Sequence, residues 1–261
     1  MTAQPHKQLK QWAAKPFEHV VAYLRETAEF AEAVTFGLAN TGRLALAEEL
    51  FQELERRDPA LLSEDSSEAS ARLMDLRKRA ERADKQIQEG LPLLHSQMAI
   101  GIWSVLEAAI DDFVVAWMTH VPISLASDDL SKIKVPAALF EQMDKAGRMQ
   151  FLLEEYKRNL RSESKAGIER FESLLKPLGL SGQVPDDARK DIFELSHIRN
   201  AILHRASRAD QKLLEACPWL TLKVGERVIV TGADSDRFAR SVTNYLKAVI
   251  ERARLVEDAV T

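Results

Sequence analysis

The amino-acid sequence predicts an all-α fold, namely a helical bundle with one small β-hairpin and an N-terminal helical extension. Hydrophobic residues recur at spacings of three and four along most of the chain, which is the period of an amphipathic helix. The 261 residues include only 10 glycines and 9 prolines, so tight turns are few. Hydrophobic residues make up 46% and charged residues 29%, a globular composition that supports a buried core.

Residues 1–90 are predicted to form a separate helical region. A short helix is expected over residues 7–14 and a longer one from Pro16, because proline suits the first turn of a helix. Asn40-Thr41-Gly42 is expected to break that pattern and start another helix. A linker is expected over residues 61–67, before a further helix with one apolar stripe. The stripe consists of Leu73, Leu76, Ala80, Ala83 and Ile87.

Residues 91–261 begin with the most hydrophobic segment of the chain. Leu93 to His120 is apolar around much of its circumference, as expected of a central helix. A loop over residues 121–135 and two or three helices within residues 137–176 are expected to follow. Glycine and proline between Gly179 and Pro185 end this group of helices.

The last part of the chain is predicted to contain a helix, a hairpin and a closing helix. The first helix runs from Asp186 to about Ala206. Residues 220–224 and 227–230 are apolar or alternating, and Gly225-Glu226 between them fits a two-residue hairpin turn. The final helix begins near Asp234.

Charge and cysteine content narrow the possible functions. A net charge of −4 and a pI near 5.9 exclude a globally basic nucleic-acid binder, so any RNA contact needs a local basic patch. Cys217 is the single cysteine, so no internal disulfide forms and a buried thiol is expected. We find no signal-peptide pattern and no apolar run of membrane-spanning length, and we expect a cytoplasmic protein without a membrane partner.

The segment from Glu194 to His204 carries the strongest functional signal. It places His197, Asn200 and His204 within about 60° of one another on an otherwise apolar helix. A solvent-facing stripe more often contains lysine, glutamate or glutamine, and histidine and asparagine are poor helix formers. The pattern indicates a functional site.

Arg199, Asn200 and His204 resemble the Arg-Asn-x-x-x-His motif of the HEPN superfamily. An earlier helix with aromatic and acidic residues, here Trp103 to Glu107, and a hairpin with a closing helix after the motif are similar to parts of that superfamily. The resemblance covers about residues 91–256 and implies that residues 91–261 form a HEPN-like helical domain. It does not explain the residues before about Gly90.

The resemblance implies a metal-independent endoribonuclease without a cofactor, acting as a toxin or antiviral defence effector. The RNA 2′-hydroxyl is the nucleophile, His204 the general acid or base, Arg199 the phosphate-binding group and Asn200 an orienting group. It also implies a homodimer in which two motifs face one groove. We expect Glu107 and His197 to support this site, with Glu107 pairing with Arg199.

Three further cations, Arg205, Arg208 and Lys190, are candidates to track an RNA backbone, and no Cys/His or carboxylate cluster with metal-ligand spacing is present. Arg199 and His204 are five residues apart and therefore about 140° apart on a regular helix. They converge only if the helix ends or the arginine side chain wraps around it. A structural role, with Arg199 paired to a carboxylate and His204 near the helix dipole, is an alternative interpretation of these residues.

Two other functions are consistent with the sequence. The first is a non-catalytic HEPN interaction module that dimerises and binds a protein partner or a nucleotide. The second is a helical adaptor in which residues 1–90 bind a regulatory protein partner.

Overall fold

The computed structural model describes residues 9–57, 66–160 and 166–260. These residues form ten α-helices and two short 3-10 helices, and they contain no β-strand. The predicted all-α class is therefore confirmed. Part of the predicted linker, residues 61–65, lies outside the described residues, and α2 already begins at Ser66.

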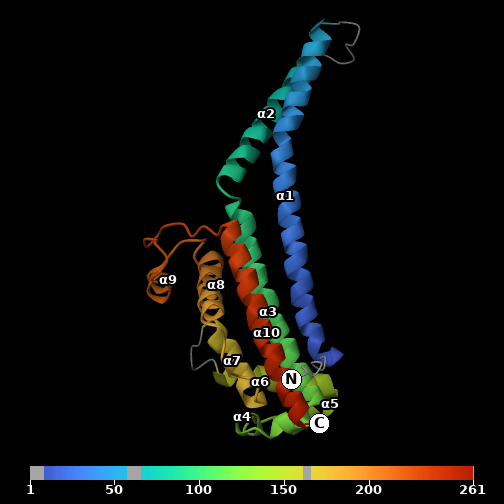
Figure 1. The fold of residues 1–261 in the computed structure, drawn as a ribbon, viewed down its shortest axis with the longest axis vertical. Helices are drawn as coiled ribbons and strands as arrows, with labels where there is room; N and C mark the ends of the chain where they lie inside the picture. The colour runs from blue at the N-terminus through green and yellow to red at the C-terminus, as the bar shows by residue number, and fades with distance from the viewer. Residues whose placement is uncertain (1–8, 58–65, 161–165, 261) are drawn as a thin grey trace, which may run out of the picture.

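The helices divide into a long arm and a body (Figure 1). The arm consists of α2 (Ser66–Gln88) and the adjoining part of α1 (Gln11–Arg57), while the start of α1 packs on the body. Two long helices, α3 (Pro92–His120) and α10 (Gly232–Val260), run side by side through the body, and α8 (Asp186–His204) packs against both. The remaining elements are η2 (Pro122–Ala126), α4 (Asp128–Ser131), α5 (Ala137–Gln142), α6 (Lys145–Leu160), α7 (Ile168–Leu175), η4 (Lys176–Leu178) and α9 (Gln211–Ala216).

The long helix α1 is continuous, so the predicted breaks before Pro16 and at residues 40–42 are wrong. Asn40 Nδ2 donates to the Phe36 carbonyl at 2.7 Å and Thr41 Oγ1 donates to the Gly37 carbonyl at 3.2 Å. These side chains are therefore satisfied inside the helix and do not cap a new one. At the other end, Phe17 packs on α3, which stabilises helix on both sides of the proline.

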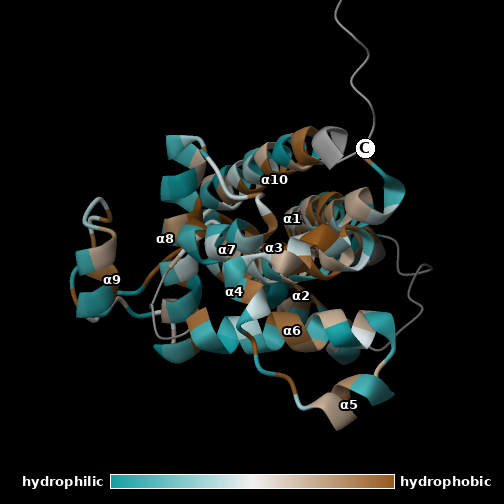
Figure 2. Ribbon diagram, turned by 90° about the horizontal axis from the view of Figure 1, so that it is seen from below, coloured by the Kyte–Doolittle hydropathy of each residue, from teal (hydrophilic) through white to brown (hydrophobic). Residues whose placement is uncertain are grey.

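The central helix α3 is confirmed as the core of the body. Its largest apolar side chains are almost fully buried and contact α1, α6, α8 and α10. They include Ile102, Leu106, Ile110, Phe113 and Trp117. Within the described residues, no helix combines the length and the apolar character needed to cross a membrane. Figure 2, a view from below, shows α10, α8, α7 and α6 arranged around α3.

The predicted hairpin does not form, and the turn lies one residue earlier than predicted, with Val224 and Gly225 at its centre. Glu226 N donates to the Lys223 carbonyl at 3.0 Å, which closes a turn around Gly225. The residues after this turn pair through their backbone with residues 207–209 and not with residues 220–224. In this pairing, Ala209 N donates to the Glu226 carbonyl at 2.8 Å. The side chains of Val228 and Val230 are buried in this arrangement, and a single antiparallel bridge joins Arg208 and Arg227. Burial of these two side chains in the core thus accompanies the pairing with residues 207–209.

Candidate functional site

Local features of the chain explain where helix α8 begins and where it ends. Pro185 precedes it and Asp186 and Asp187 occupy its first turn, where carboxylates interact favourably with the helix dipole. At its C-terminus, the backbone N–H groups of Arg205 and Ser207 both donate to the Ala201 carbonyl. Left-handed backbone at residues 206 and 207 then turns the chain back toward the helix. His204 is consequently the last residue of α8.

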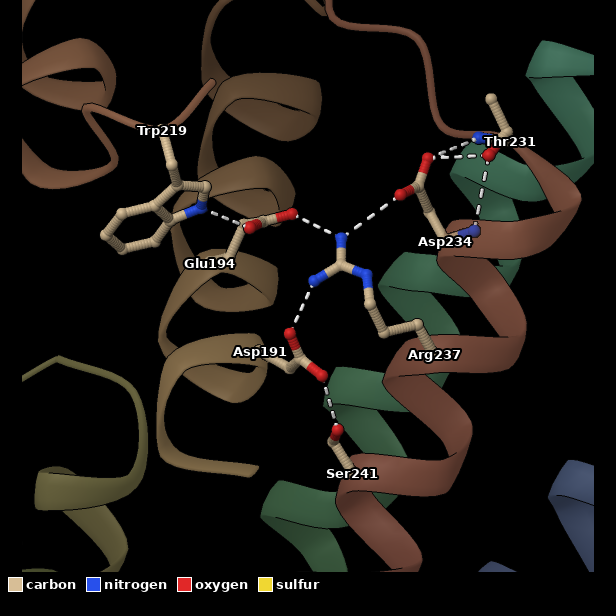
Figure 3. Close-up of polar contacts among 7 residues, drawn as sticks. All are labelled: Asp191, Glu194, Trp219, Thr231, Asp234, Arg237 and Ser241. Atoms are coloured by element: carbon tan, nitrogen blue, oxygen red, sulfur yellow. Dashed lines mark hydrogen bonds and ion pairs between the residues drawn. The ribbon is translucent and has the colours of Figure 1, made fainter. Parts of the chain in front are cut away.

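The inner face of α8 carries a buried polar network (Figure 3). Arg237 of α10 donates to Asp191 at 2.5 Å and to Glu194 at 2.6 Å. Ser241 Oγ donates to the second oxygen of Asp191 at 2.6 Å, and the Trp219 indole N–H donates to Glu194. Burial alone would lower the pKa of Arg237, but its hydrogen bonds to Glu194 and Asp191 outweigh this and raise the pKa above its ordinary value. The network joins α8, α10 and the segment after α9.

A third carboxylate, Asp234, joins this network at the start of α10. It accepts hydrogen bonds from Thr231 N at 3.0 Å, from Thr231 Oγ1 at 2.7 Å and from Arg237 at 3.1 Å. Burial would raise the pKa of Asp234, but hydrogen bonds from Thr231 and Arg237 hold it below its usual value. Three carboxylates therefore surround one guanidinium.

The outer face of α8 presents Phe193, His197, Asn200 and His204, which follow one another at spacings of four, three and four and therefore share a stripe. The rings of Phe193 and His197 lie 4.6 Å apart. Burial, and then the charge of Lys212, lower the pKa of His197, so its imidazole is neutral at pH 7. His204 is exposed to solvent.

Two adjoining hollows lie along this stripe. Arg199 lines the larger one, of about 560 Å³, and His204 lines the smaller one, of about 350 Å³. His197, Asn200 and Lys212 line both hollows. Within one chain, the guanidinium and the exposed imidazole therefore face neighbouring spaces and not the same one.

Comparison with protein-family models, with curated proteins and with solved structures found no significant match. The chemistry of the site therefore rests on its own residues. Two imidazoles, an amide, four cations and two carboxylates, Asp210 and Glu215, line the hollows, and the excess of cations suits recognition of a phosphate-containing ligand. In the described part of the chain, no three His, Cys, Asp or Glu side chains gather in a way that would hold a metal ion.

The expected pairing of Glu107 with Arg199 is wrong. Glu107 of α3 forms an ion pair with Arg170 of α7, a helix that packs against both α3 and α8. Arg199 Nη1 instead donates to Asn200 Oδ1 at 3.1 Å, and Arg199 has no carboxylate partner among the described residues. Its Nε atom is buried without a hydrogen-bond partner. Arg199 is thus a half-buried cation that no salt bridge within the described part of the chain neutralises.

The structure brings only one of the three candidate RNA-binding cations to the hollows. Arg205 lines the smaller hollow, where it pairs with Asp210 at 3.2 Å. Arg208 donates to the Gly225 carbonyl at 2.9 Å, and Lys190 lies over the Trp219 ring at 4.8 Å. Neither of these two lines the hollows, and each stabilises a neighbouring segment of the body.

Sequence reasoning missed Lys212 and Arg170 as residues of the site. Lys212 reaches both hollows because α9 folds back on α8, and Arg170 reaches the larger hollow from α7. The local positive charge of residues 189–212 was visible in the sequence. Which of those cations point toward the motif depends on the chain reversal after α8, and no local pattern predicts that reversal.

Proposed function

We propose that this chain is a HEPN-type, metal-independent endoribonuclease that acts on single-stranded RNA as a homodimer. The observation that carries the proposal is the shared edge of the two hollows. There His197, Asn200 and Lys212 lie between the guanidinium of Arg199 and the imidazole of His204. A phosphodiester at this edge lies beside His197, Asn200 and Lys212, with Arg199 in one adjoining hollow and His204 in the other.

The larger hollow suits an unstacked nucleotide. Its lining includes the partly buried aromatic ring of Phe193 together with Arg170, Arg199, Lys212 and one carboxylate, Glu215, while Trp103 is almost fully buried behind it. An aromatic ring can stack on a nucleobase, and arginine and lysine bind phosphate. A base of duplex RNA is paired and stacked and does not enter such a hollow. This favours single-stranded RNA as the substrate.

The proposed reaction needs no group beyond the RNA and the protein. The ribose 2′-oxygen attacks the adjacent phosphorus while its proton passes to a base, and the bond from phosphorus to the 5′-oxygen breaks as that oxygen gains a proton. The products are a 2′,3′-cyclic phosphate and a free 5′-hydroxyl. His204, exposed at the end of α8, is the proposed acid or base, and Arg199 stabilises the charge on the phosphorane oxygens. Asn200 orients that guanidinium through their hydrogen bond.

A second copy completes the proposed site. Within one chain, Arg199 and His204 line adjoining hollows, as expected of residues about 140° apart on a helix. Two copies with facing α8 helices would place the imidazole of one copy near the guanidinium of the other. The proposal therefore requires dimerisation through the α8 face.

A non-catalytic HEPN interaction module is the second candidate. The separation of Arg199 and His204 into two hollows favours it, because binding a phosphate needs the cations but not a converging imidazole. This alternative predicts nucleotide binding that Arg199→Ala weakens, without cleavage of RNA.

The decisive experiment measures cleavage of a fluorescent single-stranded RNA by the full chain in excess EDTA. We expect cleavage to a cyclic phosphate, and we expect His204→Ala to slow it by about 10²-fold or more. His19→Ala is the matched control, because His19 is an exposed histidine of α1 outside the site. Circular dichroism checks that each variant is folded.

Three outcomes contradict the nuclease proposal: no cleavage by the wild-type chain, cleavage that persists in His204→Ala, or cleavage lost equally in His19→Ala. Nucleotide binding without cleavage would support the module instead.

A further inference from the structure

We infer that the groove between the start of α1 and the end of α10 binds a single-chain anionic amphiphile, namely a free long-chain fatty acid. The groove has a volume of about 800 Å³. Residues between Leu9 and Arg25 line it on one side, and Ile250 and Arg254 of α10 line it on the other. Figure 1 shows both segments in the lower part of the body. The groove shares no lining residue with the hollows beside α8, so the inference does not depend on the proposed ribonuclease activity.

The lining of this groove is mainly apolar. Ala14, Ala22 and Ile250 are partly buried and Val21 is 58% exposed, while Phe17 is almost fully buried behind them. Small-molecule sites in proteins typically have volumes of about 300–1,000 Å³, a mostly apolar lining and a few polar groups that fix the orientation of the ligand. The size and the lining of the groove therefore suit a ligand with a large apolar part.

The groove is long enough for one acyl chain. The α1 residues that line it recur at spacings of three and four, so they share one face of the helix. They run from Gln11 to Arg25, which corresponds to about 21 Å along the helix axis. The two acyl layers of a bilayer together span ~30 Å, so one acyl chain spans about 15 Å. Such a chain fits along this face of α1 and leaves room for a head group.

Arg254 is the group that would recognise the head of the ligand. Its side chain is partly buried, and its Nε atom is buried without a hydrogen-bond partner. Among the residues that the structure describes, this guanidinium has no ion pair. A buried polar atom without a partner is costly, and a partly buried cation attracts an anion more strongly than one in water does. The planar fork of a guanidinium matches the two oxygens of a carboxylate.

The other charged residues of the groove favour a ligand with a single negative charge. Arg25 pairs with Glu29 at 3.8 Å, and both side chains are mostly exposed. Glu18 also lines the groove and is exposed. Solvent screens these exposed charges, so the partly buried Arg254 dominates the recognition. A phosphate monoester carries a charge of about −1.5 to −2 and would be repelled by Glu18, whereas a carboxylate needs only one cation.

Two other occupants suit this groove less well. Anionic membrane surfaces are typically bound by clusters of about four to eight lysines and arginines. The cations that line the groove are only Arg25 and Arg254. The chain's own residues 1–8 contain no Asp or Glu, so they offer Arg254 no carboxylate side chain. A fatty acid from outside the chain is therefore the favoured ligand.

The first test titrates the full chain at pH 8 with dansyl-labelled undecanoic acid and displaces this probe with sodium dodecanoate. We expect one saturable site for each chain, and we expect Arg254→Gln to weaken binding by about tenfold or more. Arg240→Gln is the matched control, because Arg240 is an exposed arginine of α10 outside the groove. Absence of saturable binding, or equal affinities of the two variants, would overturn the inference.

Ala22→Phe tests the groove without removing a charge, because the larger side chain fills the space between the two helices. We expect this variant to lose binding of the probe while circular dichroism shows an unchanged helix content. Probe binding that survives Ala22→Phe would show that the fatty acid does not lie in the groove.

A last test separates a free fatty acid from two other anions. The full chain is floated with vesicles of phosphatidylcholine and phosphatidylserine, and dodecyl phosphate replaces dodecanoate in the displacement assay. We expect no flotation and weaker binding of dodecyl phosphate. Flotation that Arg254→Gln abolishes would assign the groove to a membrane surface instead. Tighter binding of dodecyl phosphate would contradict a carboxylate ligand.

Discussion

Arg237 of α10 donates a hydrogen bond of 2.6 Å to Glu194 of α8, the helix that carries Arg199 and His204. The Glu194 side chain is 3% exposed and that of Arg237 is 30% exposed. The same guanidinium reaches Asp191, so one cation balances two carboxylates that are buried in the body. This contact fixes the face of α8 that turns inward, and thereby the face that presents the motif.

Arg237→Met is expected to lower the free energy of unfolding by about 3 kcal/mol, because it leaves Glu194 and Asp191 as buried carboxylates without their cation. Arg240→Met on the same helix is the matched control, since Arg240 is exposed and has no ion pair among the described residues. It should change stability by about 0.5 kcal/mol or less. Urea denaturation measures both variants, and equal stabilities would show that the network does not stabilise the fold.

Gly167→Ala is expected to disrupt the contact between the start of α7 and α8. Gly167 has φ 58° and ψ −138°, a conformation that residues with a Cβ atom rarely adopt. An added Cβ would also lie 2.7 Å from the Cα atom of Phe193. The strain alone costs about 1–3 kcal/mol, and the clash with backbone adds to it.

Gly179→Ala is the control for this substitution. Gly179 also has a positive φ, of 71°, but a Cβ there would contact nothing within 4 Å. The shift in melting temperature should therefore be clearly larger for Gly167→Ala. Equal shifts would mean that only the backbone conformation matters and that the close approach to Phe193 does not.

His197 makes stability depend on pH. Burial, and then the charge of Lys212, lower its pKa in the folded state below the ordinary value of 6.5. His197 therefore binds a proton more readily in the unfolded chain than in the folded one. The stability that its neutral imidazole contributes is fully present above about pH 6.5 and is lost as the pH falls through the folded-state pKa. His197→Phe should reduce the loss of stability between pH 7.5 and pH 5.5, as measured by urea denaturation at each pH. An unchanged pH profile would contradict this assignment.

Cys217 is expected to resist thiol reagents in the folded protein. It is fully buried, and burial, followed by the charge of Glu194, raises its pKa to about 12. The thiolate that reacts is therefore scarce at pH 8. Labelling of this single cysteine should be slow until denaturant is added, and mass spectrometry follows it directly. Rapid labelling of the native chain would show that the segment after α9 opens easily.

The sequence by itself determined the helical class, the central helix α3 and the position of the motif on α8. These features follow from periodicity and composition, because an apolar residue at every third or fourth position leaves a chain few alternatives to helix. The apolar stripe of α2 was predictable for the same reason, whereas the burial of Cys217 was expected because a single unpaired cysteine behaves as a small apolar residue.

Only the tertiary structure decided which residues meet. Local breaking signals at Pro16 and residues 40–42 were overridden by packing and by hydrogen bonds inside α1. A turn formed at Gly225, but the residues after it pair with residues 207–209, and Val228 and Val230 are buried. The partner of Glu107 and the place of Lys212 depend on helices far apart in the sequence. Contacts between distant helices depend on how apolar surface is buried over the whole body, and no local sequence pattern predicts them.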